Sequence, residues 1–73
     1  MAEQIKIRAP LAGKLVSISV NTSDKVEEDD EVAILESLKM ETPVYAPGAG
    51  IVADIKVKSG DYIEEDDLLL VLE

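Results

Sequence analysis

The sequence predicts an all-β domain, a flattened antiparallel barrel or sandwich of about eight short strands in two quasi-symmetric halves. The first support is a duplication, because residues 7–36 and 44–73 align without a gap at a constant offset of 37. Valine and isoleucine, which favour sheets, supply 15 of the 73 residues. In both copies apolar and polar residues alternate, as they do in a half-buried strand.

The duplication covers most of the chain and defines its organisation. One copy is too small to bury its own apolar face, so the two copies are expected to pack together around a pseudo-two-fold axis. Residues 1–73 are therefore interpreted as a single domain, in which residues 37–43 form a hairpin between the halves. Thirteen of the 30 aligned positions are identical: Ala9/Ala46, Pro10/Pro47, Ala12/Ala49, Gly13/Gly50, Ile18/Ile55, Val20/Val57, Asp24/Asp61, Glu27/Glu64, Glu28/Glu65, Asp29/Asp66, Asp30/Asp67, Leu35/Leu72 and Glu36/Glu73.

Each copy is predicted to run strand, turn, strand, turn, strand. The Ala-Pro-x-Ala-Gly segments at residues 9–13 and 46–50 indicate turns, since proline fixes φ and glycine adopts conformations that other residues resist. The strands that follow alternate in polarity, and strict alternation places one set of side chains inward. The residues expected to face inward are Val16, Ile18 and Val20 in the first copy and Ile51, Ala53, Ile55 and Val57 in the second.

A Glu-Glu-Asp-Asp run precedes the last strand of each copy, at residues 27–30 and 64–67. The runs could suggest a calcium site, but they lack the ligand spacing and central glycine of an EF-hand, so solvated turns are the preferred interpretation. Helix propensity alone permits a helix over residues 24–41. The repeat favours a strand at Glu31–Leu38 instead, because its counterpart Leu68–Leu72 is a short apolar run typical of a fully covered strand.

Composition excludes several classes of function. The chain has no cysteine and no histidine, which removes thiolate metal sites, cysteine nucleophiles and the commonest general base, so it is a poor candidate for an enzyme. A net charge of −9 disfavours nucleic acids and anionic membrane surfaces as partners. Without a predicted signal peptide or membrane span, a cytoplasmic or organelle-matrix location is expected.

The segment that joins the copies contains the candidate functional residue, Lys39. If Glu31–Leu38 and Glu41–Tyr45 are strands, Lys39 and Met40 are the two central residues of a tight hairpin. Such turns require positive φ and prefer Asn-Gly or Asp-Gly, so Lys-Met predicts backbone strain, which often marks functional positions. The other five lysines (Lys6, Lys14, Lys25, Lys56 and Lys58) are interpreted as exposed strand or turn residues.

Residues 36–41, Glu-Ser-Leu-Lys-Met-Glu, resemble the attachment motif of the biotinyl/lipoyl attachment domain family, and above all its biotin carboxyl carrier domains. The usual biotin motif of that family is Glu-Ala-Met-Lys-Met. The resemblance implies a barrel-sandwich hybrid fold, covalent biotin on Lys39, and recognition of Leu38, Met40 and Glu36 by the ligase. Leu38 and Ser37 depart from the usual methionine and alanine.

By this resemblance the chain is a carrier in a biotin-dependent carboxylase or decarboxylase and catalyses no step itself. Biotin protein ligase would attach the biotin, biotin carboxylase would load a carboxyl group, and carboxyltransferase would transfer it to an acceptor. A lipoyl carrier with lipoate on Lys39 is the first alternative, although the usual Asp before the lysine is absent. An unmodified structural module of the same fold is the second, although such modules usually lack the lysine.

Overall fold

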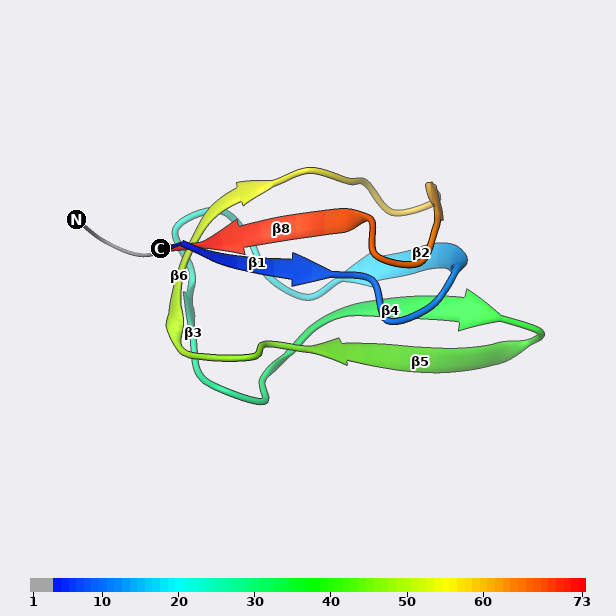
Figure 1. Cartoon of the computed structure of the whole chain (residues 1–73), viewed down its shortest axis with the longest axis horizontal. Helices are drawn as coiled ribbons and strands as arrows, with labels where there is room; N and C mark the ends of the chain where they lie inside the picture. Colours follow the sequence, from blue (N-terminus) through cyan, green and yellow to red (C-terminus); the bar gives the residue numbers. More distant parts are fainter. Residues whose placement is uncertain (1–3) are drawn as a thin grey trace.

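The computed structural model describes residues 4–73, which form an all-β domain of two four-stranded antiparallel sheets (Figure 1). One sheet has the strand order β1-β8-β6-β3 and the other has the order β5-β4-β2-β7. The strands are β1 (Ile5–Arg8), β2 (Gly13–Ile18), β3 (Lys25–Val26), β4 (Glu31–Ser37), β5 (Met40–Tyr45), β6 (Gly50–Ile55), β7 (Tyr62–Ile63) and β8 (Leu68–Leu72).

The two sequence copies are interleaved, so neither sheet belongs to one copy. Under the offset of 37 residues, β1, β2, β3 and β4 correspond to β5, β6, β7 and β8. Each sheet contains two strands from each copy. Replacing every strand by its equivalent in the other copy converts the strand order of one sheet into the strand order of the other. The predicted pseudo-two-fold arrangement of an eight-stranded antiparallel barrel or sandwich is therefore confirmed.

The symmetry extends to the residue pairing. In the first sheet Ile7 of β1 pairs with Leu70 of β8. The equivalent residues in the second sheet, Val44 of β5 and Ala33 of β4, also pair with each other. Three of these four side chains are almost fully buried and Val44 is 4% exposed, so the register of each pair is fixed by contacts in the core.

A β-bulge in each copy overturns part of the predicted alternation. The register shifts between Leu15 and Ser17 in β2, and at the equivalent place between Val52 and Asp54 in β6. Leu15 and Val52 are buried, whereas Val16 is 38% and Ile51 is 51% exposed, so the inward assignment of Val16 and Ile51 is wrong. The extra residue of a bulge changes which face the preceding side chains occupy, and strict alternation does not account for it.

Four turns of one kind connect the short strands. They span residues 21–24, 27–30, 58–61 and 64–67, and in each the last residue is an aspartate. Its carboxylate accepts a hydrogen bond from the backbone N–H of the first residue, at 2.8–3.0 Å. The solvated-turn interpretation of the two acidic runs is confirmed, because these carboxylates satisfy backbone donors. The third residues have positive φ and are Ser23, Asp29, Gly60 and Asp66.

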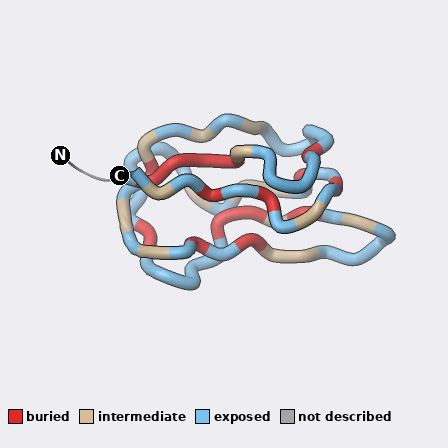
Figure 2. Tube along the Cα trace, in the orientation of Figure 1, coloured by how far each residue is buried: buried red, intermediate tan, exposed pale blue. Residues whose placement is uncertain are grey.

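The core is made of aliphatic side chains from both sheets. Figure 2 shows in red where the buried residues lie along the chain. Strand β8 is central in its sheet, and four of its five residues are buried, as expected for a strand covered on both faces. No polar side chain in residues 4–73 is buried. Hydrophobic burial and the backbone ladders therefore hold the fold together. No helix in residues 4–73 is long and apolar enough to cross a membrane.

Candidate functional site

The hairpin of β4 and β5 carries the candidate lysine at its turn. This hairpin projects at the end of the molecule opposite the C-terminus (Figure 1). Its last pair is Ser37 with Met40, so the two central residues of the turn are Leu38 and Lys39. The prediction that Lys39 and Met40 are central, with β4 ending at Leu38 and β5 beginning at Glu41, is therefore wrong by one residue.

Both central residues of this turn have positive φ. The values are 52° for Leu38 and 65° for Lys39, which matches the type I′ turn that two-residue hairpins favour. Neither leucine nor lysine adopts this conformation readily, and the cost is of the order of 1–2 kcal/mol per residue. The prediction of backbone strain at the candidate lysine is confirmed, with Leu38 as the second strained residue.

The side chains around Lys39 are exposed and largely apolar. Leu38 is 93% exposed and Met40 is 70% exposed, the first and third highest values among the large exposed hydrophobic residues. Glu36 pairs with Glu41 immediately below the Ser37–Met40 pair, and both glutamates are exposed. The structure therefore brings Glu36, Leu38, Lys39 and Met40 together at one accessible tip.

Ion pairing is absent at this tip in the described part of the chain. The salt bridge found in residues 4–73 joins Lys56 to Asp54 on β6 and the segment after it, with 2.6 Å between Nζ and Oδ2. The hydrogen bond from Lys56, together with its charge, lowers the pKa of Asp54 below its ordinary value. The Lys39 ammonium has no carboxylate partner within residues 4–73, so it remains accessible to an incoming protein.

Gly13 supports the base of the hairpin. A Cβ built on Gly13 would lie 2.5 Å from the backbone oxygen of Glu36, closer than a real Cβ approaches any atom. Strand β2 can therefore pack this closely beside β4 only because residue 13 has no side chain. The motif around Lys39 does not point to Gly13 as part of the site, although the repetition of this glycine as Gly50 is a usable signal.

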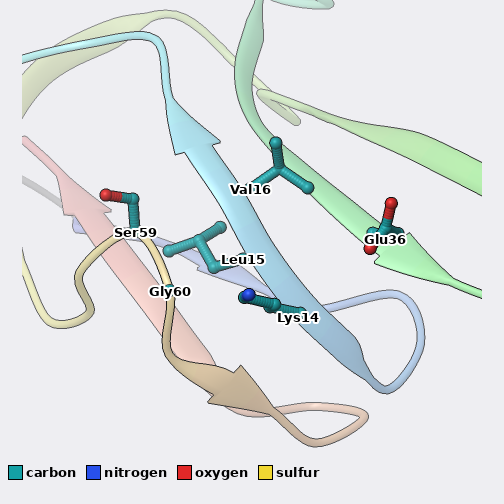
Figure 3. A pocket seen from close by; sticks show the side chains of 6 residues that line it. All are labelled: Lys14, Leu15, Val16, Glu36, Ser59 and Gly60. Carbon is teal, nitrogen blue, oxygen red and sulfur yellow. The ribbon is translucent and has the colours of Figure 1, made fainter.

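A pocket of about 360 Å³ lies beside the same hairpin base. Figure 3 shows it between β2, the end of β4 and the loop that precedes β7. Lys14 and Glu36, which line it, are register partners on the neighbouring strands β2 and β4. No sequence motif indicated this pocket, because it forms where a loop of the second copy approaches a strand of the first. Its lining residues are Lys14, Leu15, Val16, Glu36, Ser59 and Gly60.

Comparison with known proteins is consistent with this geometry. Residues 5–72 match the biotin/lipoyl family model, which is described as "Biotin-requiring enzyme". The chain is 40% identical over 43 residues to the glutaconyl-CoA decarboxylase subunit gamma of Acidaminococcus fermentans. The aligned residues cover 59% of this chain and 30% of that protein. It is 41% identical over 44 residues to a biotinylated protein of Mycobacterium bovis, covering 60% of this chain and 59% of the relative. The chain thus spans less than two thirds of the length of these relatives.

A solved structure shares the complete fold. The Kluyveromyces lactis urea carboxylase matches with a TM-score of 0.92 and 30% identity, over 100% of this chain and 6% of that enzyme. The similarity therefore includes both sheets and the hairpin, and it corresponds to a small part of a much larger chain. Since the family match spans 5–72 and the fold agrees throughout, this chain belongs to the biotin/lipoyl attachment domain family.

Proposed function

We propose that Lys39 is covalently biotinylated and that the domain carries carboxyl groups within a biotin-dependent carboxylase or decarboxylase. The observation that supports this most is the position of Lys39, at the tip of a projecting hairpin with positive φ and exposed apolar neighbours. A carrier must offer one amine to a ligase while five other lysines are also exposed. Position, and not intrinsic reactivity, distinguishes Lys39 from those lysines.

The tip fits the attachment of biotin. An amide bond would form between Nζ of Lys39 and the activated carboxyl carbon of biotin, while the activating group leaves with its electron pair and the amine loses protons to the ligase or to water. The ammonium group of Lys39 is exposed and has no ion-pair partner within residues 4–73, which meets the steric requirement for this step. The paired strands β4 and β5 hold the amine away from the bulk of the domain.

We assign recognition by the ligase to Leu38, Met40 and Glu36. Leu38 and Met40 present apolar surface on either side of Lys39, and methionine adapts to differently shaped protein pockets. Glu36 places a negative charge two pairs below the turn. A ligase that recognises all three would contact the tip from several sides and would orient the amine between them.

The attached biotin would supply a carboxyl carrier group, and the domain would supply its mobility between two active sites. Tethering raises the local concentration of the group at each site that the arm can reach. We propose biotin protein ligase, biotin carboxylase and carboxyltransferase as partners, in the cytoplasm or an organelle matrix. The relatives named as a decarboxylase subunit, a biotinylated protein and a carboxylase support this assignment.

The test is the intact mass of the domain after incubation with purified biotin protein ligase, ATP and biotin, followed by peptide mapping. A parallel reaction uses lipoate ligase with lipoate. We expect one biotinyl group, confined to the peptide that contains Lys39, and no lipoyl group. A lipoyl adduct on Lys39 would replace the proposal by the lipoyl carrier alternative. No adduct in either reaction would favour the unmodified structural module.

A further inference from the structure

The pocket beside the hairpin base combines charged and apolar surfaces. Val16, which the bulge exposes, provides the accessible apolar surface of its lining, whereas Leu15 borders the pocket but is fully buried in the core. Lys14 and Glu36 contribute opposite charges from adjacent strands, and Ser59 contributes a hydroxyl group (Figure 3). This combination fits a small ligand that has an apolar body together with both hydrogen-bond donors and acceptors.

The two charges in the pocket do not neutralise each other. Lys14 and Glu36 are direct register partners, a position from which an ion pair forms easily. The salt bridge found in residues 4–73 is nevertheless Lys56–Asp54, so both pocket charges remain available to a ligand. A ligand that accepts a hydrogen bond from the Lys14 ammonium and donates one to the Glu36 carboxylate would give both charged groups a partner.

The loop that forms the opposite wall is held in place by the backbone. The N–H of Gly60 donates a hydrogen bond to the carbonyl oxygen of Leu15 at 2.7 Å. The N–H of Leu15 donates a hydrogen bond to the carbonyl oxygen of Asp61 at 2.8 Å. Gly60 has a φ of 96°, and a Cβ built there would meet no atom within 4 Å. The wall is therefore fixed in position, and the missing side chain at residue 60 leaves open space beside β2.

We propose that this pocket is a resting site for the bicyclic ring of the biotin carried on Lys39, an inference that rests on the proposed function. The cyclic urea of biotin has one carbonyl acceptor and two N–H donors. The carbonyl would accept from the Lys14 ammonium and an N–H would donate to the Glu36 carboxylate. The sulfur-containing ring would pack against Val16. No covalent bond changes in this step.

The arm is long enough to reach the pocket. Glu36 lies three residues before Lys39, so at about 3.3 Å per strand residue the edge of the pocket is roughly 10 Å from the tip. About eleven bonds separate the Cα of Lys39 from the bicyclic ring, which gives an extended reach of roughly 14 Å. Because the ring is tethered, its effective concentration at the pocket is of the order of millimolar, so weak intrinsic binding suffices.

The repeat supplies a contrast within the molecule. At the positions equivalent to Lys14, Val16 and Ser59, the other copy has Ile51, Ala53 and Thr22. The ammonium group is therefore present in the half that adjoins the hairpin base and absent at its counterpart. This difference provides a substitution that the fold already accepts, because Lys14→Ile installs the residue found at the equivalent position of β6.

Two-dimensional NMR of the biotinylated domain tests the inference. On biotinylation we expect concentration-independent shift changes at the methyl groups of Val16 and at the amides of Ser59 and Gly60, in addition to those at the turn. In biotinylated Lys14→Ile the pocket changes should disappear while the turn changes remain. Lys25→Ile removes the same charge from the edge strand β3 and should retain both sets. Changes confined to residues 37–41 in the unsubstituted domain would overturn the proposal.

A capture experiment gives a second readout. Biotin at rest in the pocket is hidden from streptavidin, so Lys14→Ile should be captured about two- to tenfold faster than the unsubstituted domain, and Lys25→Ile at an unchanged rate. Equal rates for all three would contradict the inference. If mass analysis shows that Lys39 does not become biotinylated, the proposed function is refuted. Titration of biotin amide into the unmodified domain then tests separately whether the pocket binds the ring. Shifts at Val16, Ser59 and Gly60 would support a ring-binding pocket, and their absence at millimolar ligand would refute it.

Discussion

Gly13 of β2 lies against the backbone oxygen of Glu36 in β4, where an added Cβ would be 2.5 Å from that oxygen. We expect Gly13→Ala to lower the free energy of unfolding by about 1–3 kcal/mol, because the two strands must separate to admit the methyl group. Urea denaturation measures the loss. Shifts of the Glu36 and Ser37 amides in NMR spectra would show whether the strain reaches the base of the hairpin.

The glycines of the second copy provide graded controls for this change. A Cβ at Gly50 would lie 3.0 Å from the Glu73 oxygen, and one at Gly48 would lie 3.2 Å from the flexible end of Ile5. The destabilisation should therefore decrease in the order Gly13→Ala, Gly50→Ala, Gly48→Ala. A loss at Gly48 as large as that at Gly13 would show that close approach does not set the order.

Leu38 is expected to affect ligase recognition and stability separately. Leu38→Met restores the usual residue of biotin motifs, so it should raise kcat/KM with biotin protein ligase while leaving stability unchanged. Leu38→Asn suits positive φ better and should stabilise the domain by up to about 1 kcal/mol, but it removes the apolar contact and should slow the ligase. Steady-state biotinylation and thermal denaturation of the same samples check both effects. If the biotinylation rates of the Leu38 variants rise and fall with their stabilities, the recognition role of Leu38 is refuted.

Lys39→Arg should abolish biotinylation without unfolding the domain. Arginine keeps the positive charge and has no primary amine, and the residue is exposed at a turn, so stability should change by less than about 0.5 kcal/mol. Intact mass and circular dichroism give the two readouts. A biotinyl group on another lysine of this variant, or loss of its folded signal, would show that the site is assigned wrongly.

Ser23 and Gly60 occupy equivalent turn positions, and both have positive φ, 78° and 96° respectively. Serine is strained at positive φ and glycine is not, so Ser23→Gly should stabilise the domain by about 1 kcal/mol. The reciprocal Gly60→Ser should destabilise it by a similar amount. Denaturant midpoints measured at one pH test the pair, and changes of the same sign in both variants would contradict the backbone explanation.

The Asp54–Lys56 pair predicts a pH dependence of definite sign. Hydrogen bonding to Lys56 and its positive charge lower the pKa of Asp54 below the ordinary 3.8. A lowered pKa in the folded state means that the ionised carboxylate stabilises the fold above pH 3.8, and that this contribution is lost as the pH falls through the lowered value. NMR titration of the Asp54 carboxyl carbon should show the pKa rising in Lys56→Gln and unchanged in Lys58→Gln. Equal curves in both variants would refute the pairing in solution.

Much of the fold followed from the duplication. The repeat identified Leu68–Leu72 as the counterpart of the strand predicted at Glu31–Leu38 and thereby replaced a helix by a strand where local propensity permitted either. The acidic runs were correctly interpreted as turns, because aspartate readily hydrogen-bonds to nearby backbone N–H groups. The exposed, strained position of Lys39 followed from its place between the two copies.

The errors have a common origin in pairing between strands. In the structure Leu35 pairs with Thr42. A register in which Leu35 pairs with Val44 would place the same side chains on the inner face of the sheet. Alternation of polarity therefore does not determine which two residues form the turn. The buried contact between Ala33 and Val44 determines it. The bulges after Leu15 and Val52 and the pocket beside Ser59 also depend on partners distant in sequence, which a local pattern does not reveal.

The interleaving of the copies also sets the order in which the protein can assemble as it is synthesised. The hairpin of β4 and β5 is local and can form early, whereas β1 remains without its partner until residues 68–72 have left the ribosome. Strand β8 then joins β1 and β6 and completes the sheet. A nascent or truncated chain without residues 68–72 can therefore pair β4 with β5 and β2, but it lacks an inner strand of the opposite sheet. A ligase that reads the finished shape would reserve biotin for complete domains.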